Sequence, residues 1–73
     1  MYSLKDLEEN KHYLVTRKTT GETLEIIVLK KTSTLFSKKV TVQIYWVSDK
    51  AKCWMNDSNF DRMYDILYEV KII

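Results

Sequence analysis

The chain has 73 residues with a net charge of +2, and 45% of them are hydrophobic, which predicts one small domain over residues 1–73 with its own core. A single cysteine and a single histidine exclude an intrachain disulfide and a structural zinc site of about four such ligands, so we expect neither metal nor cofactor. No apolar run approaches the ~18 residues of a membrane span and the N-terminus is polar, so we expect a cytoplasmic protein that does not bind membranes.

The N-terminal segment predicts a short helix. The hydroxyl of Ser3 and the carboxylate of Asp6 have the spacing of a capping box, in which each side chain bonds a free amide of the first turn. We predict a helix over residues 4–9 that ends near Asn10, because asparagine tolerates the left-handed dihedrals found at helix C-termini.

A β-hairpin is expected next. Strand-like runs occupy residues 13–15 and 24–29, and Gly21 between them supplies the positive φ of a turn over residues 19–22. The second run is apolar on both faces, so we expect this strand to be central in a sheet or covered on both sides.

The clearest strand is predicted over residues 39–47, where β-branched and aromatic residues alternate with period two. A polar turn over residues 48–51 and a short strand over residues 52–55 follow. Trp46 lies on the apolar face of the long strand, so we expect it in the core, whereas the position of Trp54 is left open. The other residues expected in the core are Val42, Ile44, Ile26, Val28, Phe60, Tyr64 and Val70.

The C-terminal segment changes from helical to strand periodicity. A second loose capping box over residues 58–61 predicts a helical turn over residues 59–65. Alternation then returns in a last strand over residues 68–72. The apolar stripe that supports the helical turn consists of Phe60, Met63, Tyr64 and Leu67.

The predicted order is a helix, four antiparallel strands, a helical turn and a final strand. We therefore expect a mainly β fold, α+β by content: a small five-stranded antiparallel barrel that is partly closed, because closure removes unpaired edges. The order resembles that of SH3-like and Sm-like barrels, where a helical turn often precedes the last strand. The resemblance is one of topology and implies no function. The alternative is an open α+β antiparallel sheet with its helices on one face.

Two sets of residues have reactive or ligating groups, and neither set has the pattern of a working site. Cys53 and His12 have the chemistry of a nucleophile and a base, but no spacing brings them together, and Cys53 is expected in the core. Residues 57–61 begin like a calcium loop that then lacks its glycine and its final glutamate, so helix capping explains them better. We therefore expect a protein that is not an enzyme.

Charge and aromatic residues point instead to a binding surface. Residues 1–53 have ten Lys and Arg against six Asp and Glu, whereas residues 54–73 have two against four, which predicts a basic and an acidic side. The stretch 29–40 places an apolar pair between two lysine pairs, at what we expect to be an exposed hairpin tip. Phe36 could instead fold back over the core. The residues predicted to bind a partner are Lys30, Lys31, Leu35, Phe36, Lys38, Lys39 and Trp54.

Two functions are compatible with such a surface. The first is a protein-binding module, acting as an adaptor or as a stoichiometric inhibitor, and the lack of a catalytic pattern favours it. The second is weak, salt-dependent binding of nucleic acid through the lysines, with aromatic side chains as stacking platforms. A homo-oligomer is also possible, because a core this small gains stability from a partner.

One glycine, no proline and abundant Lys, Ile and Tyr favour an A+T-rich genome, such as that of a low-GC bacterium or its phage.

Overall fold

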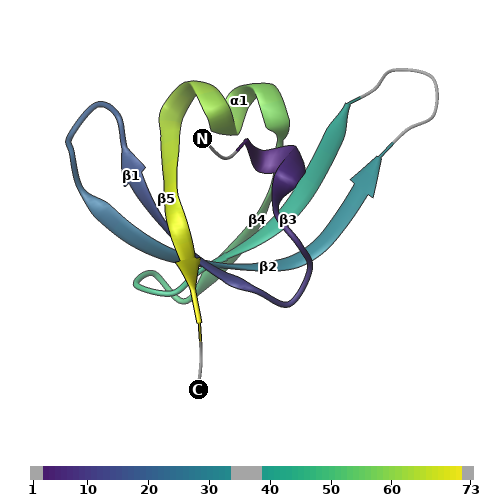
Figure 1. The fold of residues 1–73 in the computed structure, drawn as a ribbon, viewed down its shortest axis with the longest axis horizontal. Coiled ribbons are helices and arrows are strands. Elements are labelled where there is room, and N and C mark those ends of the chain that lie inside the picture. Colours follow the sequence, from purple (N-terminus) through teal and green to yellow (C-terminus); the bar gives the residue numbers. More distant parts are fainter. Residues whose placement is uncertain (1–2, 34–38, 72–73) are drawn as a thin grey trace.

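The structure is a computed structural model that describes residues 3–33 and 39–71. Within these residues it contains five β-strands, one α-helix and one 3-10 turn (Figure 1). The elements in chain order are η1 (Leu4–Asp6), β1 (His12–Arg17), β2 (Thr23–Ser33), β3 (Val40–Trp46), β4 (Ala51–Asn56), α1 (Asp57–Met63) and β5 (Tyr64–Val70).

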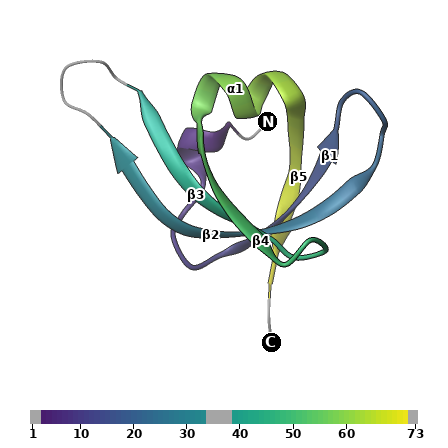
Figure 2. The ribbon, with the colours of Figure 1, turned by 180° about the vertical axis from the view of Figure 1, so that it is seen from behind.

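The five strands form one antiparallel sheet with the order β4-β3-β2-β1-β5. The expected mainly β fold of five antiparallel strands with little helix is therefore confirmed. The expected closure into a barrel is wrong, because β4 and β5 are the two edges of the described sheet and do not pair with each other. The sheet bends instead, and η1 and α1 lie in the opening between its raised ends (Figure 2).

The hydrophobic core lies on the concave face of the sheet, against η1 and α1. Alternate residues of the central strands point into it, and Ile26, Val28 and Ile44 have no exposed surface. Trp46 packs against the core as predicted, with its ring centroid 5.1 Å from that of Tyr64. The buried residues are Leu4, Leu7, Tyr13, Val15, Leu24, Ile26, Val28, Val42, Ile44, Phe60, Tyr64 and Ile66.

Two β-bulges change which side chains face the core. Leu29 is left out of the pairing of β2 with β3, so that Lys31, and not Lys30, shares the core side of β2. Leu67 is left out of the pairing of β5 with β1, and beyond it Val70 lies on the outer face. The prediction that Val70 is a core residue is therefore wrong, because simple alternation along β5 does not allow for the extra residue.

The first helical element is shorter than predicted. η1 is one turn over Leu4–Asp6 and does not continue over residues 4–9. The Asp6 carboxylate accepts a hydrogen bond from the Ser3 amide at 3.0 Å, as a capping box requires. Asn10 does have a positive φ of 65°, but in a turn four residues beyond the end of η1.

The second helical element begins and ends earlier than predicted. α1 covers Asp57–Met63, and its N-cap is Asn56, whose Oδ1 accepts the amide of Asn59 at 2.8 Å. The chain enters β5 at Tyr64, so the predicted helical stripe divides between two elements and leaves Leu67 45% exposed. No helix among the described residues combines the length and the apolar character needed to cross a bilayer.

Asp61 joins the two helical elements. Its carboxylate accepts hydrogen bonds from the Ser3 hydroxyl at 2.7 Å and from the Leu4 amide at 3.0 Å, so it holds the N-terminus of η1 on α1. The Asp61 carbonyl also accepts a hydrogen bond from Lys18 Nζ at 2.7 Å. These contacts fix the cover of the core and explain why Leu4 and Leu7 are fully buried. The sequence had indicated only a role for Asp61 at the start of its own helix.

Candidate binding surface

The outer face of the sheet, opposite the core, carries aromatic and basic side chains over β2, β3 and β4. Pairing aligns Lys30, Gln43 and Trp54 in one row across these strands. The adjacent row contains Ile27, Tyr45 and Lys52. We call the set formed by Lys30, Gln43, Tyr45, Lys52 and Trp54 the outer β4 surface.

Trp54 is the largest exposed group of this surface. Its side chain is 49% exposed, and it lies on β4, at the edge of the sheet. Neighbouring strands are about 4.8 Å apart, so Lys30 lies about 10 Å from Trp54 across the sheet, while Lys52 is two residues away on the same strand. A bulky ring is therefore flanked by two cations on one open face.

The charges are unevenly divided over the molecule. Lys30, Lys39 and Lys52 are exposed, and none of the ion pairs between described residues involves them. Between described residues the ion pairs are those of Lys11 with Glu8 and Glu69, Arg17 with Glu22, and Lys18 with Asp65, and His12 makes a hydrogen-bond contact with Glu25. Lys30 and Lys52 of the outer β4 surface thus have no ion pair with a described residue, whereas Lys11, Arg17 and Lys18 on the β1 and β5 side have carboxylate partners.

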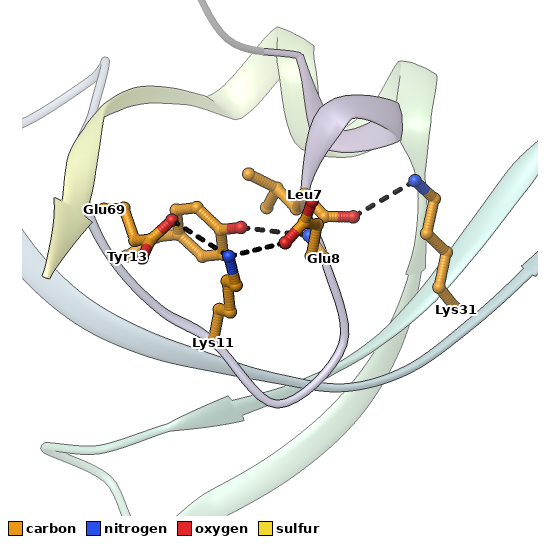
Figure 3. Close-up of polar contacts among 6 residues, drawn as sticks. All are labelled: Leu7, Glu8, Lys11, Tyr13, Lys31 and Glu69. Atoms are coloured by element: carbon orange, nitrogen blue, oxygen red, sulfur yellow. Dashed lines mark hydrogen bonds and ion pairs between the residues drawn. The ribbon is translucent and has the colours of Figure 1, made fainter. Parts of the chain in front are cut away.

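Lys31 has a structural role that sets it apart from the other lysines. The bulge at Leu29 turns it to the core side, where its Nζ donates a hydrogen bond to the carbonyl of Leu7 at 3.1 Å (Figure 3). It also donates to the carbonyl of Lys5. The backbone amide of Lys31 donates to Glu9 Oε2 at 2.9 Å. Lys31 therefore holds η1 and the following turn against β2, and its ammonium group is hydrogen-bonded within the protein.

A second group of polar contacts holds the chain between η1 and β1. The Tyr13 hydroxyl accepts the Glu8 amide at 2.9 Å, and Lys11 Nζ lies 2.6 Å from Glu8 and 3.7 Å from Glu69 (Figure 3). The hydrogen bond to Lys11, reinforced by its charge, lowers the pKa of Glu8, and the hydrogen bond to Glu8 together with the charge of Glu69 raises the pKa of Lys11. A shallow depression of 330 Å³ adjoins this group, lined by Asn10, Lys11, His12, Glu69, Val70 and Lys71.

The predicted binding residues are only partly brought together. Lys30 and Trp54 share the outer face, and Lys39 is exposed just before β3. Lys31 lies on the core side and is bonded there. Leu35, Phe36 and Lys38 lie outside the described residues, so the predicted hairpin tip stays a prediction.

Three residues of the outer β4 surface were not predicted as binding residues. Gln43 and Tyr45 alternate with the core residues of β3, and Lys52 alternates with Cys53 on β4. The alternation that placed Trp46 in the core already put Tyr45 on the opposite face. That pattern was a signal for a second, outward-facing surface.

The prediction that Cys53 is a core residue is wrong. Cys53 is exposed, because β4 is an edge strand, and its sulfur accepts a hydrogen bond from Trp46 Nε1 at 3.1 Å. His12 lies on the opposite face of the sheet, where its Nδ1 is 3.1 Å from Glu25 Oε2. The structure thus separates the two residues that could have formed a nucleophile and base pair.

The described residues contain no group of three or more His, Cys, Asp or Glu side chains placed to hold a metal ion. Comparison of the chain with protein-family models, with curated proteins and with solved structures gave no match.

Proposed function

We propose that the chain is a small non-enzymatic binding module of the cytoplasm that acts by protein–protein contact, as an adaptor or as a stoichiometric inhibitor. The observation that carries the proposal is the half-exposed Trp54 on an open edge strand, flanked by the cations Lys30 and Lys52. The separation of Cys53 from His12 supports a role without catalysis.

The energies identify Trp54 as the anchor of this surface. A tryptophan side chain can bury about 150–250 Å², so a partner that covers the exposed half removes about 100 Å² from water. At about 25 cal/mol per Å² this contributes roughly 2.5 kcal/mol, close to two powers of ten in affinity. An exposed ion pair between a lysine and a carboxylate of the partner contributes about 0–1 kcal/mol. Lys30 and Lys52 therefore mainly affect the association rate and the choice of partner.

We propose in addition that the fold is a relative of the SH3-like and Sm-like barrels. The strand order and the helical turn before the last strand support this relation, while the unpaired edges β4 and β5 depart from a closed barrel. The relation concerns topology, and the function is argued from the outer β4 surface alone.

A second candidate function is the binding of single-stranded nucleic acid. Tyr45 and Trp54 lie on one face with Lys30 and Lys52, which supports base stacking beside phosphate contacts. Lys30, Lys52 and the neighbouring lysines together neutralise about three or four phosphates. The affinity is therefore weak, and it falls steeply as the salt concentration rises. Protein binding is preferred because the large apolar contribution of Trp54 does not depend on salt.

A capture experiment with the immobilised full chain tests this proposal. The wild-type chain, Trp54→Ala and Tyr68→Ala are each incubated with extract of the organism that encodes the chain, at low and at high salt. Tyr68 is the matched control, because it is an exposed aromatic residue, 54% accessible, on the opposite edge strand β5.

The proposal predicts that a nuclease-resistant protein partner is captured by wild type and by Tyr68→Ala but lost with Trp54→Ala, at both salt concentrations. Capture that disappears with nuclease, or that is abolished at high salt, supports nucleic acid instead. Equal capture by all three proteins contradicts the assignment of the site.

A further inference from the structure

The two edges of the sheet differ in how well they are protected against pairing with another strand. β4 is six residues long, its register with β3 is unbroken, and residues 51–54 are exposed. β5 carries the bulge at Leu67, and the acidic side chains Asp65 and Glu69 are ion-paired to Lys18 and Lys11. Bulges and edge charges are the usual means by which proteins block edge pairing. β5 has both, whereas β4 has one charged side chain, Lys52.

We propose that β4 accepts an extended acidic segment of a partner protein as a sixth strand of the sheet. This rests on the proposed protein-binding function and specifies how the same site works. Strand addition lets the backbone supply the hydrogen bonds, while the side chains beside each residue of the edge select the partner. The backbone groups of β4 that face away from β3 pair with no other described strand, and they form the row of donors and acceptors that such a segment needs.

The side chains of β4 specify the chemistry of the segment. On the outer face Lys52 favours carboxylates, whose methylene groups can pack beside the Trp54 ring. On the core side, the exposed Ala51 and Cys53 and the half-buried Met55 favour small apolar residues. A segment that alternates acidic with small apolar residues therefore satisfies both faces of the edge. Lys30, which forms no ion pair with a described residue, adds to the attraction.

A second copy of the chain fits this edge less well than an acidic segment. Pairing of two β4 strands joins two edges that each carry Lys52 and no carboxylate, so a second copy supplies no opposite charge for Lys52 from its own β4. Like charges close together oppose association. Charge complementarity thus favours a different, acidic partner.

Peptide libraries test the inference directly. The immobilised full chain is offered capped eight-residue peptides in which Asp or Glu alternates with Val, Ile, Thr or Ala. The control library has the same composition, but all acidic residues precede all apolar ones. The inference predicts enrichment of alternating over blocked peptides by about tenfold or more, because only alternation places acids and apolar groups on separate faces of a strand.

The best peptide is then resynthesised with N-methyl groups on every second residue, in both possible registers. A strand pairs with one neighbour through alternate residues, so one register should lose binding by about tenfold or more and the other should retain it. On the protein, Lys52→Glu should weaken binding by up to about fivefold, whereas Lys71→Glu, with the same change of charge on an exposed residue beyond β5, should not.

The outcomes separate this inference from the proposed function. Equal binding of both N-methylated registers, or no preference for alternating peptides, overturns strand addition, while the Trp54 capture result stands by itself. Self-association of the free chain through β4, shown by sedimentation and abolished by added peptide, overturns the choice of partner in favour of a second copy. Tighter binding of oligothymidylate than of any peptide overturns both in favour of nucleic acid.

Discussion

Replacement of Asp61 by alanine should destabilise the protein by detaching η1 from α1. The carboxylate accepts two partly buried hydrogen bonds, from the Ser3 hydroxyl at 2.7 Å and the Leu4 amide at 3.0 Å. A hydrogen bond to a charged group contributes about 1.5–3 kcal/mol, and partial exposure places both at the lower end. Because the two share one carboxylate, we expect a joint loss of about 2–3 kcal/mol.

This loss is large for a domain of 73 residues, whose total stability is about 4–11 kcal/mol at ordinary values per residue. The melting temperature should fall by about 10–20 °C, and the urea midpoint should shift to match. Asp61→Asn is the matched control. Its side-chain oxygen still accepts the Leu4 amide and its NH2 group can donate to Ser3, so it should cost less than half as much.

The double variant Ser3→Ala, Asp61→Ala distinguishes this contact from an effect within α1. If the two residues act together, the double variant should be little worse than Asp61→Ala alone. Strict additivity of the two substitutions, or an unchanged melting temperature in Asp61→Ala, would refute the reasoning and leave burial of Leu4 and Leu7 as the force that holds η1.

Three further predictions concern stability. Ile44→Ala should cost about 2–5 kcal/mol and Ile44→Val about 0.5–1.5 kcal/mol in thermal melts, because Ile44 is fully buried, and equal melting temperatures would contradict its place in the core. Lys31→Met should lower the melting temperature without weakening partner binding, since its Nζ is bonded to carbonyls of the η1 segment; weakened binding with unchanged stability would contradict this role. Lys11→Ala should raise the pKa of Glu8 toward its ordinary value in an NMR titration, because the hydrogen bond and the charge of Lys11 are the largest causes that lower it. The stabilisation from this pair is present at neutral pH, and it is lost as pH falls through the lowered pKa of Glu8 or rises through the raised pKa of Lys11, so an unshifted Glu8 in wild type would contradict the ion pair.

Local periodicity predicted the strands and most of the core. The alternation in residues 39–47 identified the buried face of β3, because period two leaves one set of side chains on each side. Gly21 marked the turn between β1 and β2 correctly, and it has a φ of 73°. These features depend on residues close together in the chain, which is why the sequence reveals them.

Features that depend on long-range pairing were missed. The bulges at Leu29 and Leu67 arise from the registers of paired strands, and each reverses the faces beyond it, as Lys31 and Val70 show. Cys53 was expected in the core, but it is exposed on the edge strand β4. The sequence of an apolar strand does not show whether the strand lies at the edge or in the centre of a sheet. The tie between Asp61 and Ser3 joins opposite ends of the chain and has no local signature.

The candidate site was predicted only in part, because it too depends on the pairing of strands. Trp54 and Lys30 were identified by residue type, but their alignment with Gln43 follows from strand pairing. Tyr45 and Lys52 gain their significance only once β4 is known to be an unpaired edge beside them.

The most direct test of the account is a map of backbone amide chemical shifts in the full chain, with and without a saturating amount of the partner isolated by capture. The account predicts that the large changes lie on β4, at Trp54 and its neighbours, and on the outward-facing residues of β3, including Tyr45. Changes confined to β1 and β5, around Tyr68 and the Lys11 ion pairs, would contradict it.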